Sequence, residues 1–224
     1  MKTYNILIVD DHPIIASAYK VALLSIEKKK EDYKFDIDTA IDIDSAEKYF
    51  SKNPKQKAYD LVFLDIKLPK STDGKLLSGE DLGIEIRKQS PNTKIIIATT
   101  YNDNYRINNI LKSVDPDGFL VKNDITPDEL VGSIKSIIDG IPYYSETVVK
   151  LLRKHISNNF YLDKIDRQLL YELSTGTKMM DLPSIIPMSI GGIERRKRQL
   201  KEIFNISKGD DKALVDIAKE RGFI

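Results

Sequence analysis

The chain has 224 residues, and its 35 Lys and Arg residues nearly balance its 34 Asp and Glu residues, giving a formal net charge of +1 at pH 7. This length exceeds that of a typical domain, so we expect two domains, each with its own core. The absence of cysteine excludes disulfide bonds and thiolate metal sites. No apolar run approaches the roughly 18 residues of a membrane span, and a signal-peptide pattern is missing. We therefore expect a cytoplasmic protein with no membrane contact.

Four apolar runs in the first half of the chain end at polar residues. The run 61–64, LVFL, is typical of a strand that is covered on both faces. In open parallel sheets, ligands bind at the carboxyl ends of the strands, so the residues that follow such runs are candidates for one shared pocket. These residues are Asp10 and Asp11 after the first run, Asp65, Thr99, and Lys122.

The first 140 residues alternate between strand-like and helix-like patterns. The segment 126–140 is a well-delimited helix, with Thr126 at the N-cap, Pro127 at the first position, Glu129 at the third and Gly140 past the end. Asp44 or Ser45 is a candidate cap of a shorter helix that is expected to extend to about Phe50. The expected strands are 5–11, 35–41, 61–64, 94–98 and 118–122. Their alternation with five helices predicts a doubly wound parallel sheet with right-handed crossovers.

The polar residues at the strand ends suit phosphoryl transfer. Mg²⁺ prefers oxygen ligands and usually takes one or two carboxylates, which Asp10, Asp11 and Asp65 can supply. A carboxylate can also attack phosphorus if the charge on the transferring oxygens is neutralised, and the cation and Lys122 would neutralise it. Any one of these residues, taken alone, more often has only a structural role at the start of a loop or the end of a strand. Their occurrence at four separate strand ends favours the functional interpretation.

These residues carry a resemblance to a known family. The chain resembles the receiver domain of two-component response regulators in the Asp pair at 10–11, the segment D-x-x-L-P at 65–69, Thr99 and Lys122. It resembles the NarL/FixJ subfamily in the segments DDHP at 10–13 and GFLVK at 118–122. The resemblance covers residues 4–140 and implies a flavodoxin-like sheet of order 2-1-3-4-5. The roles that it implies are Asp65 as phosphoacceptor, Asp10, Asp11, Asp65 and the carbonyl of Lys67 as Mg²⁺ ligands, Lys122 as the phosphate-binding lysine, and Thr99 with Phe119 as switch residues.

Two features depart from the usual receiver pattern. The segment between Pro69 and Gly79 is about six residues longer than the family's P-x-x-x-G, and we interpret it as a lid, a partner contact or tolerated surface, since a loop lengthens at little thermodynamic cost. Phe119 lacks the hydroxyl of the commoner tyrosine. Lys67 and Tyr101 occupy positions at which the family tunes hydrolysis of the acyl phosphate.

The second half of the chain is helical in pattern. Residues 141–160 form an expected linker with a short helix, and Asp163 is placed to cap the next one. The segment 181–187 begins with Asp181, a candidate helix cap. Within it, Pro183 is tolerated only in the first turn of a helix, and Pro187 must end the helix. Ser189 then caps a longer helix, and a last helix covers 211–221. A short helix, a turn and a longer helix form the helix-turn-helix arrangement.

The longer helix has one apolar stripe, formed by Ile193, Leu200 and Phe204, and a basic face opposite. Such a face suits the DNA major groove, because Arg pairs with guanine, carboxylates accept from cytosine, and flanking cations meet phosphates. Residues 162–206 resemble the LuxR-type DNA-binding domain, although two prolines, Gly192, Lys197 and Lys201 depart from its pattern. The DNA-binding residues that we expect are Ser189, Glu194, Arg195, Arg196, Lys197, Arg198 and Lys201.

The sequence therefore predicts an α/β receiver domain at 1–140, a linker at 141–160 and an all-α helix-turn-helix domain at 161–224. We expect a transcription regulator that a histidine kinase phosphorylates on Asp65, that uses Mg²⁺, that forms a homodimer when phosphorylated, and that binds double-stranded promoter DNA. On this hypothesis the chain is not an enzyme. One alternative is a Mg²⁺-dependent phosphohydrolase, although those enzymes need D-x-D after the first strand. The other alternative is a receiver that controls a protein-binding module without DNA binding.

Overall fold

The computed structural model describes residues 2–29, 32–50, 57–101, 103–154, 162–206 and 210–224. The chain divides into two compact units, of which the first comprises residues 1–102 and 113–155 and the second residues 103–112 and 156–224. Among the described helices, none is long and apolar enough to cross a membrane. The expected domain limits at residues 140 and 160 stay a prediction.

The first unit is built on a parallel sheet. Its strands are β1 (Lys2–Val9), β2 (Tyr33–Ala40), β3 (Leu61–Leu64), β4 (Lys94–Thr99), β5 (Gly118–Val121) and β6 (Tyr143–Tyr144). The strand order is β2-β1-β3-β4-β5-β6, and every neighbouring pair is parallel. The predicted order of the first five strands is confirmed, and the nearly continuous apolar character of β3, β4 and β5 follows from burial on both faces.

The expectation of five strands was wrong by one. The sixth strand, β6, lies in the segment that was expected to be a linker, and two residues are too few to show an alternating pattern. It forms because the outer edge of β5 has free backbone groups: Tyr143 N donates to Asp117 O at 3.2 Å and Ser145 N to Phe119 O at 2.9 Å. The Ser145 hydroxyl also accepts a hydrogen bond from Val121 N at 3.1 Å.

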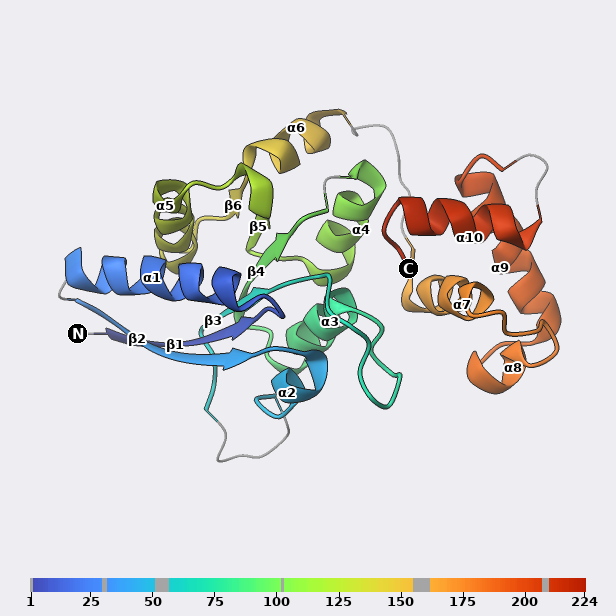
Figure 1. Cartoon of the computed structure of the whole chain (residues 1–224), viewed down its shortest axis with the longest axis horizontal. Helices are drawn as coiled ribbons and strands as arrows, with labels where there is room; N and C mark the ends of the chain where they lie inside the picture. The colour runs from blue at the N-terminus through green and yellow to red at the C-terminus, as the bar shows by residue number, and fades with distance from the viewer. Residues whose placement is uncertain (1, 30–31, 51–56, 102, 155–161, 207–209) are drawn as a thin grey trace. The chain divides into compact units, whose positions relative to one another are not determined.

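Helices cover both faces of this sheet (Figure 1). The helices of the receiver-like part are α1 (Pro13–Lys29), α2 (Ile43–Glu47), α3 (Gly79–Gln89), α4 (Asn104–Val114), α5 (Pro127–Ile138) and α6 (Glu146–Lys154). Helices α1 and α5 pack together on one face, where Leu23, Ile26, Ile134 and Ile137 are buried against strand residues such as Phe63. Figure 1 shows α2 and α3 on the other face. Burial of this kind contributes roughly 1.5–3 kcal/mol for each large apolar side chain.

Capping residues explain where the helices begin. Thr126 and Glu129 form the predicted capping box of α5, with Pro127 in the first turn. The prediction that Asp44 or Ser45 caps the second helix was wrong, because Asp42 is the cap and accepts a hydrogen bond from Ser45 N at 2.7 Å. Asp44 is instead the carboxylate that anchors the following long loop. The expected end of this helix, near Phe50, lies beyond the observed end at Glu47.

The enlarged loop after β3 is held by specific hydrogen bonds. Thr72 donates to the Asp44 carboxylate through both its N, at 3.0 Å, and its Oγ1, at 2.7 Å. Within the loop, the Ser71 hydroxyl donates to Asp73 at 2.7 Å, and Gly79 N donates back to Ile66 O at 3.1 Å. The insertion is therefore an ordered turn beside the end of β3, and its role stays a prediction.

The second unit contains, besides residues 104–112 of α4, four further helices among its described residues: α7 (Lys164–Ser174), α8 (Leu182–Ile185), α9 (Ile190–Ile203) and α10 (Asp211–Glu220). They share one core, with Leu170, Leu182, Ile193, Leu200 and Leu214 almost fully buried. Asp163 caps α7 and Ser189 caps α9, as predicted. Asp181 occupies the N-cap position of α8 without a side-chain hydrogen bond, and α8 ends at Ile185, before Pro187. A short helix, a turn and a longer helix are thus present.

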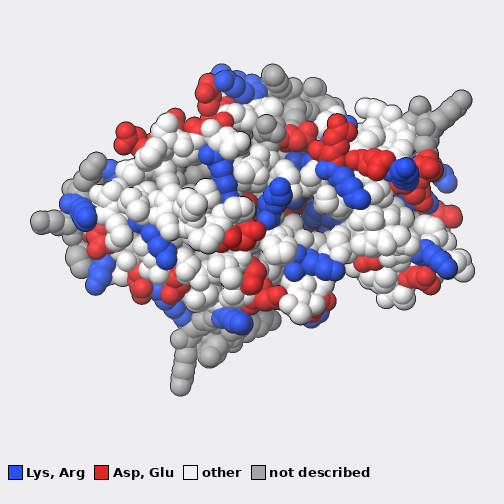
Figure 2. Space-filling view, in the orientation of Figure 1, with Lys and Arg blue, Asp and Glu red and all other residues white. Residues whose placement is uncertain are grey.

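Charged side chains are interspersed on the surface of the first unit. On the face drawn in Figure 2, Lys and Arg alternate with Asp and Glu over this unit, and neither sign covers a large area. This agrees with the balanced composition of the chain. The distribution of charge consequently does not identify a binding surface on that face.

We expect Gly79→Ala to destabilise the first unit by several kcal/mol. A Cβ atom at Gly79 would overlap the carbonyl oxygen of Asp65, and the neighbouring atoms are backbone atoms of Asp65 and Ile66, which cannot move aside as a flexible side chain could. Gly132→Ala is the matched control, because that helical glycine is exposed and its Cβ would meet no atom within 4 Å. The control should stabilise α5 by about 0.5–1 kcal/mol. Urea denaturation measures both, and equal effects of the two variants would contradict the predicted packing.

Candidate functional site

Two buried aspartates lie at neighbouring strand ends. Asp10 follows β1 and Asp65 follows β3, and these two strands are hydrogen-bonded to each other, with Val9 opposite Leu64. The ladder continues one step further, since Asp65 N donates to Val9 O at 2.9 Å. The Asp10 and Asp65 side chains are only 1% and 3% exposed. The register of β1 with β3 therefore brings both carboxylates to one place.

Lys122 joins these two carboxylates from the end of β5. Its Nζ lies 2.8 Å from Asp10 Oδ2 and 2.6 Å from Asp65 Oδ2, and its side chain is 8% exposed. The second oxygen of each carboxylate accepts a backbone N–H: Asp10 Oδ1 from His12 and Asp65 Oδ1 from Lys67, each at 3.0 Å. The Asp65 carboxylate is thus fixed by contacts to both of its oxygens.

The charges at this site do not balance. Burial raises the pKa of the Asp10 carboxyl above its usual value, an effect that outweighs the hydrogen bond from Lys122. Asp11 adds a third carboxylate at the exposed rim. Three carboxylates and one ammonium leave two negative charges in excess, which one divalent cation would neutralise. The donor set, mainly carboxylate oxygens near solvent, fits Mg²⁺.

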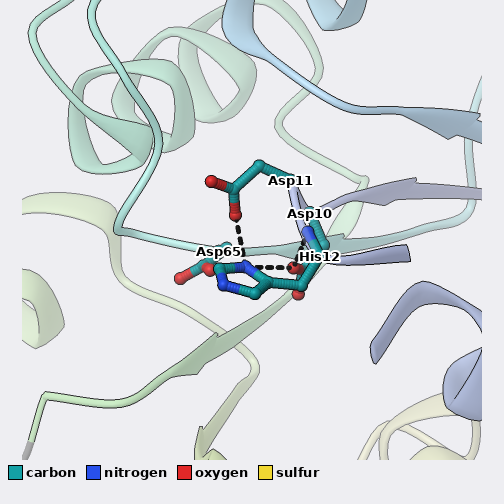
Figure 3. Close-up of side chains that lie close together, drawn as sticks. All are labelled: Asp10, Asp11, His12 and Asp65. Carbon is teal, nitrogen blue, oxygen red and sulfur yellow. Dashed lines mark hydrogen bonds and ion pairs between the residues drawn. The ribbon is translucent and has the colours of Figure 1, made fainter. Parts of the chain in front are cut away.

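The cluster also includes His12, a residue that the sequence analysis did not assign to the site. One ligand atom from each of Asp10, Asp11, His12 and Asp65 lies within 4.8 Å of the others. Figure 3 shows the imidazole among the three carboxylates, with Nδ1 2.6 Å from Asp11 Oδ1. The available signal was the position of His12 directly after two aspartates. The backbone carbonyl of Lys67 stays a predicted ligand.

The expected switch residues lie on the two strands beyond β3. Thr99 ends β4, is fully buried and pairs with Val121, the residue before Lys122. Its Oγ1 accepts a hydrogen bond from Tyr101 N at 3.2 Å. Phe119 is fully buried within β5. The strand order thus places Thr99 beside the site. Phe119 lies on the neighbouring strand β5, two residues before Val121, the partner of Thr99.

Tyr19 of α1 is a second residue that the sequence analysis did not assign to the site. Its ring stacks on Phe63 with 4.7 Å between the centroids, and its pKa is raised, first by burial and then by the charges of Asp10 and Asp65. A neutral, buried phenol therefore forms part of the apolar surroundings of the carboxylates. Its helical pattern alone gave no reason to separate it from other core positions.

The basic residues of α9 in the second unit fall into two groups. Arg196 is bound to Asp163 and Asp166, with both N–O distances 2.7 Å. Asp211 binds Lys197 at 2.9 Å and Lys201 at 3.0 Å. These three cations therefore hold the N-terminal ends of α7 and α10 against α9. Sequence spacing on one helix could not show this, because each partner lies on another helix.

The other group is exposed. Three side chains, those of Glu194, Arg195 and Arg198, project from α9 and make no hydrogen bond or ion pair to another described residue. Ser189 lies at the start of the helix, where its hydroxyl accepts a hydrogen bond from Gly192 N at 3.3 Å. The exposed face of α9 thus presents two guanidinium groups and one carboxylate to solvent.

The raised pKa of Asp10 predicts a pH-dependent stability of the metal-free protein. The folded state holds the Asp10 proton more tightly than the unfolded state, so this stabilisation is present below pH 3.8 and is lost as pH rises through the raised pKa. Relative to Asp10→Asn, the parent should therefore lose stability as pH rises through that range. Urea denaturation in EDTA measures the difference.

Asp117→Asn is the control of opposite sign. Burial alone would raise the pKa of Asp117, but hydrogen bonds from Lys94, Ile95 N and Arg87 lower it below 3.8. Relative to this variant the parent should lose stability as pH falls through the lowered pKa. A parent-minus-variant difference of the same sign for both positions would contradict the assignment at Asp10.

Comparison with known proteins identifies the first unit. Residues 6–135 match the family model of the response regulator receiver domain. The chain is 22% identical to the oxygen regulatory protein NreC of Staphylococcus carnosus, over 90% of this chain and 91% of NreC. It is 26% identical to the transcriptional regulatory protein RcsB of Escherichia coli K12, over 88% and 87%. A structure of RcsB from Salmonella enterica serovar Typhimurium, bound to promoter rprA in the presence of phosphomimetic BeF3−, shares the fold with a TM-score of 0.66 and 20% identity, covering 96% of this chain and 98% of that one. The chain belongs to the response regulator receiver domain family.

Proposed function

We propose that Asp65 is the phosphoacceptor of this protein. The observation that carries the proposal is the ammonium of Lys122, which binds Asp10 and Asp65 at once within a buried site. In the reaction, an oxygen of the Asp65 carboxylate attacks phosphorus, a new P–O bond forms, and the bond from phosphorus to the donor breaks with departure of the donor group. The product is an acyl phosphate on Asp65. On this proposal the chain accepts the phosphoryl group rather than turning over a substrate.

The neighbouring side chains have distinct roles in this step. Lys122 neutralises charge on the transferring oxygens, and Asp10 keeps the ammonium in place. A bound Mg²⁺ would supply further charge neutralisation, held by Asp10, Asp11, Asp65 and the Lys67 carbonyl. The Thr99 hydroxyl, which lies beside the site at the end of β4, would donate to a phosphoryl oxygen.

The partner that supplies the phosphoryl group is a histidine kinase, as is expected for a receiver domain. A phosphorylation switch works only through a free-energy difference between two conformations. Movement of Thr99 toward the phosphoryl group would vacate space next to β5, where Phe119 is buried. These two residues are therefore the proposed switch.

We expect acetyl phosphate with Mg²⁺ to add one phosphoryl group to the parent and none to Asp65→Asn, because the amide is a poor nucleophile toward phosphorus. Intact-protein mass spectrometry measures the addition. Hydroxylamine should remove the group, as it does from acyl phosphates. Asp73→Asn is the matched control, because Asp73 is exposed in the adjacent loop, and it should be labelled like the parent. Equal labelling of Asp65→Asn would overturn the proposal.

We further propose that the second unit binds double-stranded DNA in a sequence-specific manner. Its α8 and α9 form a helix-turn-helix, with Ile193 and Leu200 of α9 buried and Glu194, Arg195 and Arg198 exposed. Arg side chains read guanine in the major groove and a carboxylate accepts from cytosine. Arg196, Lys197 and Lys201, by contrast, already bind carboxylates, so any phosphate contact from them would compete with these ion pairs.

The relatives support this proposal. RcsB structures that share the fold include two RcsB dimers bound to two parallel DNAs, with a TM-score of 0.58. By analogy, we propose that phosphorylation favours a homodimer of this chain and that the dimer binds paired half-sites in promoter DNA. Promoter DNA as the target implies that the protein acts in the cytoplasm. Regulation of transcription is the output that joins the two units.

Arg195→Ala and Arg198→Ala should each relax the sequence preference of DNA binding. The test uses a duplex that the parent protein enriches from a random-sequence library. Loss of one bidentate base contact should cost about 1–3 kcal/mol on this duplex and much less on unrelated DNA. Lys219→Ala is the charge-matched control, because Lys219 is an exposed cation on α10.

Arg196→Ala separates a structural role from a DNA-reading role. Its removal leaves the Asp163 and Asp166 carboxylates without their shared cation, so the thermal stability of the second unit should fall while the ranking of DNA sequences is kept. A parent that enriches no sequence, or an Arg198→Ala variant with undiminished preference, would contradict DNA reading by this face.

A further inference from the structure

His12 presents its ring to the acidic cluster. Nδ1 lies 2.6 Å from Asp11 Oδ1 and 3.5 Å from Asp10 Oδ1. The two oxygens of Asp10 are divided between opposite sides: Oδ2 contacts Lys122, and Oδ1 lies on the side of His12. Figure 3 shows the ring close to the carboxylates of Asp10, Asp11 and Asp65. A nitrogen donor is therefore added to the oxygen donors of the site.

The backbone holds this histidine in place. His12 N donates to Asp10 Oδ1 at 3.0 Å, and His12 O accepts from Ile15 N at 3.0 Å and Ala16 N at 3.1 Å in the first turn of α1. The residue is thus fixed between the end of β1 and the start of α1. Its side chain is nevertheless 63% exposed. The ring can therefore turn Nδ1 from the Asp11 carboxylate to a metal ion without disturbing the packing of the core.

The donor atoms are grouped nearly as closely as the ligands of one ion. Ligands at about 2.1 Å from an octahedral cation lie about 3 Å apart when adjacent and about 4.2 Å apart when opposite. The donor atoms of Asp10, Asp11, His12 and Asp65 all lie within 4.8 Å of one another. Small movements of the exposed Asp11 and His12 would bring all four within bonding distance of one centre.

We infer that His12 is a direct nitrogen ligand of the cation and that the site consequently prefers divalent ions of the first transition row, such as Mn²⁺, over Mg²⁺. This inference rests on the proposed function, because it assigns a further ligand to the same site. The chemical reason is that imidazole binds transition-metal ions well, whereas Mg²⁺ prefers carboxylate and water oxygens.

The competing interpretation gives His12 an indirect role. In that case the ring N–H donates to the Asp11 carboxylate and only orients it, as partners of metal ligands commonly do. The two interpretations differ in one measurable property, which is whether a histidine nitrogen is bonded to the metal. The chain suits this measurement, because its two histidines are His12 and His155.

The test uses the full chain labelled with 15N only at histidine, carrying His155→Gln so that His12 is the single labelled residue. Mn²⁺ is the probe, and pulsed electron paramagnetic resonance detects nitrogen nuclei bonded to it. We expect a directly bonded 15N signal that disappears in His12→Gln. Titrations should show that His12→Gln weakens Mn²⁺ binding by about tenfold or more, while the Mg²⁺ affinity, obtained by competition, changes by less than about threefold.

Each outcome has a distinct meaning. A bonded 15N signal together with the selective loss of Mn²⁺ affinity supports the inference. Mn²⁺ that binds the parent without a bonded 15N signal overturns the role of His12 as a ligand and leaves the phosphoacceptor site intact. A parent that binds neither ion overturns both the inference and the cation-dependent part of the proposed function. Asp11→Asn serves as a positive control for loss of affinity for both ions.

Discussion

The ammonium of Lys122 between the carboxylates of Asp10 and Asp65 is the contact on which the receiver site depends. All three side chains are nearly excluded from water, so each charge needs its partners to remain ionised at an acceptable cost. One cation shared by two anions leaves the group negative, and Asp11 at the rim increases this excess. The site is therefore held together by ion pairs and at the same time retains an excess of negative charge that suits a further cation.

This arrangement requires three strands in a fixed register. Asp10, Asp65 and Lys122 come from the ends of β1, β3 and β5, and β4 lies between the last two. A slip of one residue in any pair would turn the apolar side chains of that strand to the opposite face and remove its polar residue from the site. The cores on the two faces of the sheet therefore maintain the site geometry, even though no core side chain takes part in the chemistry.

The second unit uses ion pairs in a different way. Three of the basic residues on α9 bind carboxylates of Asp163, Asp166 and Asp211, which lie at the starts of α7 and α10. The Asp163 carboxylate also satisfies a free backbone N–H group as the cap of α7, so this anion both begins a helix and fixes its neighbour, whereas α10 is capped by Asp210. The consequence is a firmly held α9 with a small set of exposed charged side chains, with Arg195 and Arg198 at its centre.

The sequence by itself determined the parts that depend on short-range physics. Helix caps such as Thr126, Asp163 and Ser189, and the apolar strand runs that end at Asp10, Asp65 and Lys122, follow from local hydrogen bonding and residue periodicity. Only the tertiary structure decided the rest. The strand β6 and the pairing of Arg196 with Asp163 both depend on which groups the fold brings together across space. The spacing of residues along the chain does not predict such contacts, because they are set by strand register and helix packing between distant segments.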